Sequence, residues 1–378
     1  MRTAIAISTL LAGAIAAIAT AVAWYYTAAL HQRALLAGTS PDRKNLLIAS
    51  VEEGLIGLRA IDGDDADLHC PGIFGLEWEG GRANVGPPLG ERDGYVLRPF
   101  ERLHGRGPTP GDMARLDSFV FGDDPAAAHG IEFREVTIEM PSGPAPAWIV
   151  DGPSATWAVA VHGKGASRRE ALRMLPALVQ AGLPVLVPTY RNDPELAPPP
   201  GGRYGYGQLE WRDIEAAVAH ARAAGAERIV MVGFSMGAAI VLAFLQRSPL
   251  ATHVEALVLD APMLSLRSVV ERRAGDQGMP GPLIAYGRAV AARRFGLDWK
   301  ATDYRAFARS LELPVLLFHG ESDPTIAVEF SDELAAACRG RVTYVRVPGA
   351  RHVRSWNVDP EGYRAAVAGF LGDLTPAR

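Results

Sequence analysis

A serine flanked on both sides by glycine is the first candidate for chemistry in this chain. Ser235 lies in the run Gly233–Gly237 (GFSMG), after the apolar segment 229–232 and before the apolar segment 236–246. A G-x-S-x-G string at a strand-to-helix turn presents the serine hydroxyl above a sheet, and the small glycines let the turn close. The N-terminus of the following helix stabilises developing negative charge. We therefore predict that Ser235 is a nucleophile rather than a residue of a surface turn.

A serine hydroxyl attacks a carbonyl only when a base takes its proton, and that base needs an acid to orient it. His352 follows the last expected strand, and Asp323 follows the strand before it. The order serine, acid, histidine along the chain is the one expected for a G-x-S-x-G nucleophile. We predict His352 as the general base and Asp323 as its acid. Asp260, at the end of an earlier strand, is the rival acid, and Glu321 is a further alternative.

Two backbone N–H groups are needed to hold the oxyanion that forms during acyl transfer. The N–H of Met236 directly follows the nucleophile, and the loop 162–165 (HGKG) follows the apolar run 157–161. The two glycines of this loop let the backbone approach a substrate. We predict that the N–H groups of Met236 and Lys164 form the oxyanion hole, and that His162 supports the loop rather than acting as a second base.

Composition and cysteine spacing exclude several function classes. The 378-residue chain has 38 Lys and Arg against 42 Asp and Glu, a net charge of −4, and no long basic run, which argues against nucleic-acid binding. Cys70 and Cys338 lie in no C-x-x-C pair and beside no histidine at metal-ligand spacing, so a zinc site is not expected. We expect two buried, unpaired thiols, and the sequence leaves a disulfide between them open.

The elements that must position these residues alternate between strand and helix from residue 131 onward. Apolar inner strands separated by helices predict a mostly parallel sheet that is covered by helices on both faces. Ligands of such a sheet bind at the carboxyl ends of its strands, where the candidate residues lie. The expected strands are 131–140, 146–150, 157–161, 185–187, 228–233, 256–260, 314–319 and 342–347, and the expected helices are 168–181, 207–224, 236–246, 331–338 and 360–370.

Two further regions interrupt or precede this alternation. Residues 264–310 are rich in arginine and are expected to form a helical cap over the carboxyl edge of the sheet, within a domain spanning 131–378. Residues 31–130 begin with a polar linker and continue with a Gly-, Pro- and Asp-rich stretch that contains only short apolar runs. We expect this stretch to be a small appendage of strands and loops.

The N-terminal residues 1–30 form an apolar segment with no charged residue between Thr3 and Leu30. The segment exceeds the roughly 20 residues needed to span a bilayer, so we predict a single-pass transmembrane helix and a location in the cell membrane. Trp24 and the two tyrosines after it would then lie at the membrane interface. The alternative is a signal peptide cleaved near Ala23, which would make the protein secreted.

Four short motifs occur in the order found in the α/β-hydrolase superfamily. They are 162–165 (HGKG), 233–237 (GFSMG), 319–323 (HGESD) and 349–352 (GARH). Over residues 131–372 the chain resembles bacterial membrane-associated hydrolases related to serine-aminopeptidase and prolyl-oligopeptidase-type domains. This resemblance implies acyl transfer to water through an acyl-serine intermediate, without a metal or organic cofactor. The runs 190–193 (YRND) and 210–213 (EWRD) look like signatures of a subgroup, either as a pocket rim or as a buried polar network.

The favoured function is that of a serine hydrolase that cleaves a carboxylic ester of a small-molecule or lipid-like acyl substrate. A serine peptidase, either an aminopeptidase or one resembling prolyl oligopeptidase, is the alternative. In the cap over 264–310 arginines outnumber carboxylates, which disfavours the acidic pocket that an aminopeptidase needs for its substrate's ammonium group. A hydrolase fold that only binds its ligand is a third hypothesis, disfavoured because all three candidate catalytic residues are present.

Overall fold

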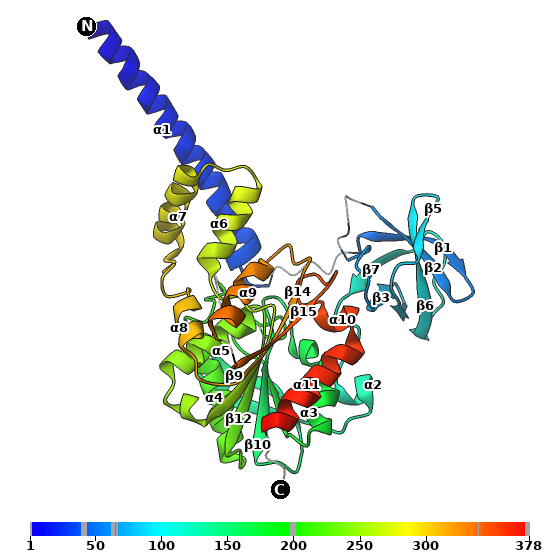
Figure 1. Cartoon of the computed structure of the whole chain (residues 1–378). Helices are drawn as coiled ribbons and strands as arrows, with labels where there is room; N and C mark the ends of the chain where they lie inside the picture. Colours follow the sequence, from blue (N-terminus) through cyan, green and yellow to red (C-terminus); the bar gives the residue numbers. More distant parts are fainter. Residues whose placement is uncertain are drawn as a thin grey trace.

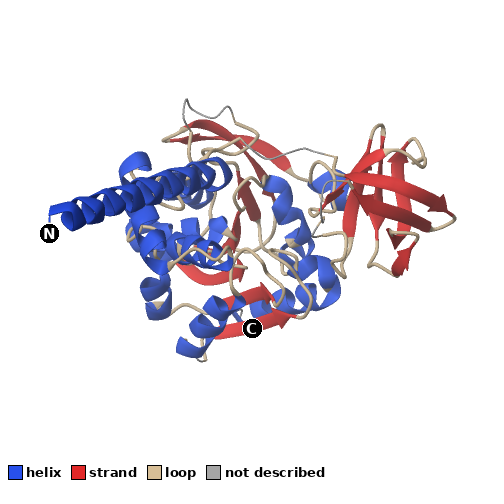
Figure 2. Ribbon diagram, turned by 90° about the horizontal axis from the view of Figure 1, so that it is seen from above, coloured by secondary structure: helices blue, strands red, loops and turns tan. Residues whose placement is uncertain are grey.

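The computed structural model describes residues 2–38, 44–61, 65, 67–196, 202–338 and 340–374. The side chains of residues 2–9, 11, 12 and 15 also lie outside the described part. Two sheets dominate the molecule, one over the N-terminal third and one over the remainder (Figure 1). The N-terminal sheet and the first helix lie on different sides of the larger sheet in both overall views (Figures 1 and 2).

The N-terminal sheet has 7 strands in the order β2-β1-β7-β3-β4-β6-β5, and an additional pairing of β2 with β6 closes it on itself. Its inward residues form a separate apolar core that includes Phe74, Leu76 and Trp78. The region predicted as a small appendage of strands and loops is thus a sheet with its own core. The strands are β1 (Leu46–Glu52), β2 (Leu55–Ala60), β3 (Phe74–Trp78), β4 (Gly81–Val85), β5 (Gly90–Arg92), β6 (Tyr95–Gly105) and β7 (Met113–Asp117).

A buried arginine organises the loop between β2 and β3. Arg98 of β6 is fully buried, and its guanidinium donates to the carbonyl oxygens of Gly86, Leu68 and Gly72 at 2.7, 2.9 and 2.6 Å. Burial lowers the pKa of Arg98 to about 10, and nearby acidic groups oppose that shift. The carbonyl oxygens satisfy the buried donors, so this charged side chain holds the described part of the loop in place.

The larger sheet has 8 strands in the order β15-β14-β13-β12-β10-β11-β9-β8. The six neighbouring strands β15, β14, β13, β12, β10 and β11 pair in parallel. In contrast, β9 pairs antiparallel with both β8 and β11. This is the mostly parallel sheet that the sequence predicted. The strands are β8 (Arg134–Met140), β9 (Gly143–Val150), β10 (Thr156–Val161), β11 (Val185–Pro188), β12 (Arg228–Phe234), β13 (Val254–Asp260), β14 (Val315–Gly320) and β15 (Val342–Val347).

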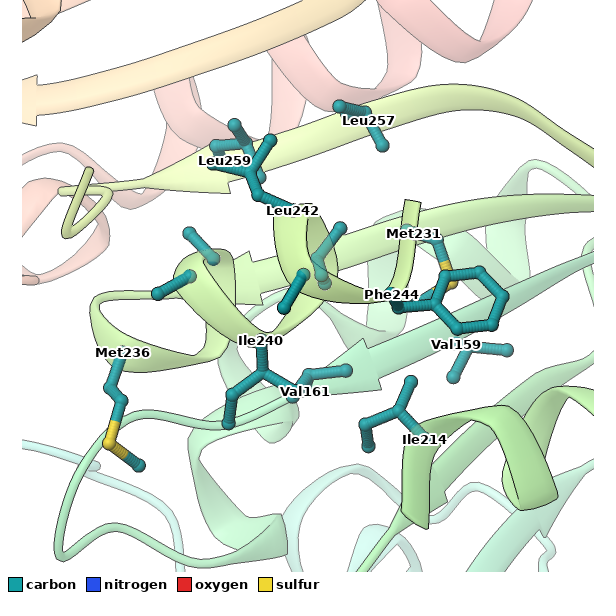
Figure 3. Packing of buried hydrophobic residues seen from close by; sticks show 14 of the residues in the cluster. Val159, Val161, Ile214, Met231, Met236, Ile240, Leu242, Phe244, Leu257 and Leu259 are labelled. Atoms are coloured by element: carbon teal, nitrogen blue, oxygen red, sulfur yellow. The ribbon is translucent and has the colours of Figure 1, made fainter. Parts of the chain in front are cut away.

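Helices cover both faces of this sheet, because alternate strand residues point to opposite sides. Val159 and Met231 face one core, which α4 (Trp211–Ala223) and α5 (Met236–Arg247) close (Figure 3). Ala158 and Val230 face the other core, which includes α3 (Leu175–Gln180) and α11 (Pro360–Leu374). The remaining short elements are α2 (Pro125–His129), the 3-10 helices η2 (Arg168–Arg173) and η3 (Pro249–His253), α8 (Arg305–Ser310), α9 (Val328–Ala337) and α10 (Ser355–Val358).

The arginine-rich insertion contains α8 and two longer helices, α6 (Leu266–Asp276) and α7 (Gly281–Phe295), and these two lie above the carboxyl edge of the sheet (Figure 1). The first helix, α1 (Arg2–Leu30), continues as a π-helical turn, η1 (His31–Leu35), and lies beside them. Ala23 and Thr27 of α1 are only 2% and 3% exposed. The C-terminal half of α1 is therefore part of the packed structure.

This arrangement bears on the predicted transmembrane helix over 1–30. Among the described residues, no helix is both long enough and apolar enough to cross a membrane, so the predicted span is not supported. The guanidinium of Arg294 lies over the ring of Trp24, 3.4 Å from the centroid. The location of the protein in the cell stays a prediction.

Candidate active site

The candidate nucleophile lies at a sharp turn between a strand and a helix. Ser235 follows β12 and precedes α5, and its backbone has φ 48° and ψ −113°, a conformation that is strained for a residue with a side chain. A Cβ on Gly237 would clash with the carbonyl oxygen of Val161, and one on Gly233 would lie 2.7 Å from the Cα of Ala238. The flanking glycines are therefore required by close approach of backbone, as the motif predicted.

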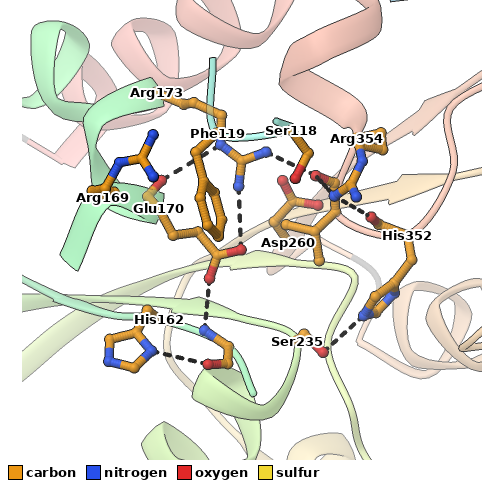
Figure 4. Close-up of polar contacts among 12 residues, drawn as sticks. Ser118, Phe119, His162, Arg169, Glu170, Arg173, Ser235, Asp260, His352 and Arg354 are labelled. Carbon is orange, nitrogen blue, oxygen red and sulfur yellow. Dashed lines mark hydrogen bonds and ion pairs between the residues drawn. The ribbon is translucent and has the colours of Figure 1, made fainter. Parts of the chain in front are cut away.

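Ser235, His352 and Asp323 meet at the carboxyl edge of the sheet. His352 Nε2 lies 2.8 Å from Ser235 Oγ, and Nδ1 of the same ring lies 2.7 Å from Asp323 Oδ2 (Figure 4 shows the first contact). Ser235 and His352 lie 117 positions apart in the chain, and Asp323 lies 29 positions before His352. The geometry allows the imidazole to accept the hydroxyl proton while the carboxylate fixes the ring.

Asp323 is held in its ionised form by several donors. Its Oδ1 accepts the backbone N–H groups of Thr325 and Ile326 at 2.7 and 2.9 Å, and His319 Nε2 lies 3.2 Å from Oδ2. Burial on its own raises the pKa of this carboxyl, but the hydrogen bonds from His319 and His352 outweigh burial and hold the pKa well below its ordinary value. His319, which had no predicted role, therefore supports the acid.

The rival acids lie elsewhere. Asp260 is buried beneath the site, where the hydroxyls of Ser355 and Tyr363 lie 3.3 and 3.2 Å from its carboxylate. Burial raises the pKa of Asp260 to about 6, against the opposing field of Arg173. Glu321 is exposed and pairs with Arg346 at 3.0 Å. Of the three candidate acids, Asp323 is the one whose carboxylate oxygen lies within hydrogen-bond distance of the His352 ring.

The two predicted oxyanion donors lie next to the nucleophile. Met236 is the first residue of α5, a position where the N–H has no acceptor within the helix. In the opposing loop the N–H of Gly163 is occupied, because it donates to Glu170 Oε2 at 2.6 Å (Figure 4). The following residue, Lys164, lines the same cavity as Ser235. The oxyanion role of Met236 and Lys164 stays a prediction.

The side chain of Lys164 links the loop 162–165, the predicted oxyanion loop, to the N-terminal segment. Its Nζ donates to the carbonyl oxygen of Arg33 at 3.0 Å and lies over the ring of Tyr204, 5.4 Å from the centroid. Burial lowers the pKa of this amine. Sequence reasoning missed this contact, because nothing in the local pattern around Lys164 indicates a partner 131 residues away.

The two subgroup signatures form a buried polar network. Asp213 is fully buried and accepts two hydrogen bonds from the Arg191 guanidinium at 2.7 and 2.8 Å. Glu210, also fully buried, accepts the N–H groups of Gly205 and Gly207. His162 stacks on Tyr190 and forms a buried ion pair with Asp193 at 2.6 Å. The sequence left open whether these runs form a pocket rim or a buried polar network, and in the structure they form the buried network. His162 supports the loop, as predicted.

Two cavities meet at Ser235. One of about 590 Å³ extends from Ser235 and Met236 between α1, α6 and α7. The other, of about 390 Å³, lies on the His352 side and reaches Asp67 of the loop before β3. A substrate bound at Ser235 can therefore extend in two directions, one toward the cap and one toward the closed sheet.

Among the described residues, no group of three or more His, Cys, Asp or Glu side chains could hold a metal ion. Cys70 and Cys338 are both buried and both free, which confirms the predicted unpaired thiols. The chemistry that the site can perform is that of the serine, the imidazole and the carboxylate.

Two family models match the sequence. Residues 158–366, more than half of the chain, match the model described as the alpha/beta hydrolase family. Residues 61–117, most of the closed sheet, match a domain of unknown function, DUF8805. No curated protein matches the chain.

Solved structures resemble the larger domain. An esterase of Pyrococcus furiosus, Pf2001, is 22% identical and covers 67% of this chain and 95% of its own, with TM-scores of 0.53 and 0.52 in two crystal forms. An esterase from a Rhodococcus species is 19% identical and covers 64% of this chain and 99% of its own, with a TM-score of 0.45. At this identity the likeness to the Pyrococcus enzyme establishes the fold.

Proposed function

Since the chain belongs to the alpha/beta hydrolase family, we propose that it cleaves carboxylic esters through an acyl-serine intermediate on Ser235. The observation that supports this proposal is the continuous hydrogen-bonded series from Ser235 through His352 to Asp323, at 2.8 and 2.7 Å. The proposal assigns Ser235, His352 and Asp323 the roles of nucleophile, general base and orienting acid. It also assigns stabilisation of the oxyanion to the backbone N–H groups of Met236 and Lys164.

The reaction begins when Ser235 Oγ attacks the ester carbonyl carbon and His352 Nε2 takes the hydroxyl proton. The carbonyl π electrons move to oxygen, and the N–H groups of Met236 and Lys164 stabilise that charge. As the carbonyl re-forms, the bond to the alcohol oxygen breaks, and the imidazolium gives its proton to that oxygen. Water then repeats the cycle: His352 takes a water proton, the hydroxide attacks the acyl carbon, and the proton returns to Ser235 as the acid leaves.

Asp323 stays ionised throughout this cycle. Its depressed pKa keeps the carboxylate charged next to the ring, so it stabilises the imidazolium formed in each half-reaction. The strain at Ser235 is consistent with this role, since strained backbone is retained where it serves a site.

The lining of the larger cavity favours esters over substrates with a free amino terminus. Among the described residues that line it, the charged side chains are Arg33, Lys164, Arg273 and Arg288, and none is acidic. An ammonium group bound there would meet only like charge, which is unfavourable in a partly desolvated site. An aminopeptidase is therefore disfavoured, and the intact hydrogen-bonded series argues against a protein that only binds.

Labelling with a fluorophosphonate probe tests the assignment of Ser235. The full chain is expected to be labelled, and Ser235→Ala is expected to lose all labelling and all hydrolysis of p-nitrophenyl acetate. Ser310→Ala serves as the matched control, because its hydroxyl contacts only the carbonyl oxygen of Phe307 at the surface. Undiminished labelling of the Ser235→Ala protein would contradict the proposal.

A further inference from the structure

The cavity beside Ser235 has an unusual wall. One side is formed by α6 and α7 of the cap, and the opposite side is formed by the end of α1, through Tyr26, Ala29 and Leu30. Apart from four basic side chains, the lining is mainly aliphatic, aromatic and methionine side chains. An apolar space that begins at a nucleophile and runs away from it matches the shape of an acyl chain.

The contacts that hold α1 in place come from α7. Arg294 of α7 donates to the carbonyl oxygen of Trp24 at 3.1 Å and to Thr27 Oγ1 at 2.7 Å. One helical turn further on, the ring of His31 stacks on Phe295 with centroids 4.8 Å apart. The wall is thus fixed by α7, while Tyr26, Ala29 and Leu30 of α1 line the cavity.

The π-helical turn η1, which follows α1, is bound to the hydrolase domain. Tyr206 Oη donates to the carbonyl oxygen of Ala34 at 2.7 Å, and the Tyr204 N–H donates to that of Leu35 at 2.8 Å. Together with the bond from Lys164 Nζ to Arg33, these contacts tie η1 to the oxyanion loop. The N-terminal segment therefore continues the substrate cavity down to the reacting atoms.

The second cavity differs in chemical character. It is lined by Asp67, Arg351 and Arg354 along with glycines of the oxyanion loop, and Asp67 pairs with Arg354 at 2.9 Å. The two cavities together suit an ester with one apolar half and one polar half. The apolar half would lie toward α1 and the cap, and the polar half toward the closed sheet.

We propose that α1 is a structural wall of the acyl-binding site, and that the substrate is an ester of a long, unbranched acyl chain with a polar alcohol. This proposal rests on the esterase function proposed above, and it makes the N-terminal helix a determinant of substrate specificity. Each methylene buried in the cavity contributes about a fourfold gain in kcat/KM, until the cavity is filled.

The experiment uses the full chain and p-nitrophenyl esters from acetate to dodecanoate. Wild-type kcat/KM is expected to rise with acyl length, and Ala29→Trp, which fills the cavity from α1, is expected to lower the decanoate-to-acetate ratio at least tenfold. Ala21→Trp is the matched control on the same helix, because Ala21 is exposed and does not line the cavity. Its ratio should equal that of the wild type.

A second variant fills the cavity from the opposite side. Gly287 of α7 lines the cavity, and a Cβ added there meets no atom within 4 Å, so Gly287→Leu is expected to fold and to lower the same ratio. A fall with Gly287→Leu but not with Ala29→Trp would overturn the role of α1. A wild-type profile that is flat with acyl length would overturn the long-chain substrate.

Failure of the inference and failure of the esterase function give different results. If α1 does not form a wall of the acyl-binding site, short esters are still hydrolysed in a manner that depends on Ser235. The ratio of kcat/KM for decanoate to that for acetate is then unchanged by Ala29→Trp. If the protein is not an esterase, neither acetate nor decanoate is hydrolysed by the wild type. Thermal unfolding of each variant separates a filled cavity from a misfolded protein.

Discussion

The carboxylate of Asp67 binds the guanidinium of Arg354, with Oδ2 lying 2.9 and 3.1 Å from two of its nitrogens. Asp67 lies in the loop between β2 and β3 of the closed N-terminal sheet, and Arg354 follows the candidate base by two residues. Arg354 Nη1 also donates to the carbonyl oxygen of His352 at 3.1 Å (Figure 4). The loop before β3 thus contacts the segment that carries His352, through the ion pairs of Asp67 with Arg354 and, at 3.8 Å, with Arg351.

Substitution of Asp67 should lower catalysis more than it lowers stability. The two side chains are only 21% and 20% exposed, so Asp67→Asn leaves Arg354 with a weaker partner and loosens the His352 loop. We expect kcat for a short ester to fall about tenfold, which corresponds to about 1.4 kcal/mol in the barrier. Steady-state kinetics on p-nitrophenyl acetate measures this change.

Asp112→Asn is the matched control, because Asp112 lies in the same N-terminal unit and pairs with Arg106 at 2.8 Å rather than with the hydrolase domain. Its kcat should remain that of the wild type. Equal losses in the two variants would mean that the ion pair of Asp67 has no particular effect on His352. Asp67→Glu, which keeps the charge, should recover part of the lost kcat.

The stability of the protein should depend on pH through Asp260. Burial raises the pKa of Asp260 to about 6 from an ordinary value of 3.8. Between these values the folded protein binds the proton more tightly than the unfolded chain, so the free energy of unfolding falls as the pH rises from about 4 to about 6. The loss amounts to at most about 3 kcal/mol. Asp260→Asn, which does not titrate, should lack this loss.

Urea denaturation at intervals between pH 4 and pH 7 measures the difference between the two proteins. Tyr363→Phe is a useful control, since it removes the hydroxyl on Asp260 Oδ2 but keeps the buried carboxyl. That variant should retain the fall in stability with rising pH. An Asp260→Asn protein whose pH dependence equals that of the wild type would refute a raised pKa at this position.

The turn at Ser235 should tolerate no side chain at position 237. A Cβ there would overlap the carbonyl oxygens of Val161 and His162, both of which are backbone atoms that cannot move aside. We expect Gly237→Ala to lower the free energy of unfolding by at least about 2 kcal/mol and to abolish labelling of Ser235. Thermal unfolding and fluorophosphonate labelling measure the two effects.

Gly369→Ala is the control for Gly237→Ala, because an added methyl group should be tolerated at position 369. Gly369 lies within α11, and a Cβ added there meets no atom within 4 Å. Alanine should therefore stabilise the protein by about 0.5–1 kcal/mol and leave labelling intact. A Gly237→Ala protein that behaves in the same way would show that the turn does not require glycine.

The sequence by itself predicted the central sheet and the three residues that meet at its carboxyl edge. Apolar strands, glycine-flanked turns and the order serine, acid, histidine are local patterns, and local patterns specify which conformation each short segment adopts. The parallel sheet then brings the ends of its strands to one edge, which is why Ser235, Asp323 and His352 come together although they are far apart in the chain. The boundaries of most strands differ from the prediction by a few residues.

Only the tertiary structure decided how the N-terminal 130 residues relate to the site. The apolar residues of α1 were compatible with a membrane, but packing on α7 decides that Trp24 meets Arg294 and that Ala29 lines a cavity at Ser235. Likewise, nothing near Asp67 in the sequence indicates Arg354, 287 residues away. Such contacts depend on which surfaces of separate elements meet, and an amphipathic or apolar pattern states that a surface will be buried without stating against what.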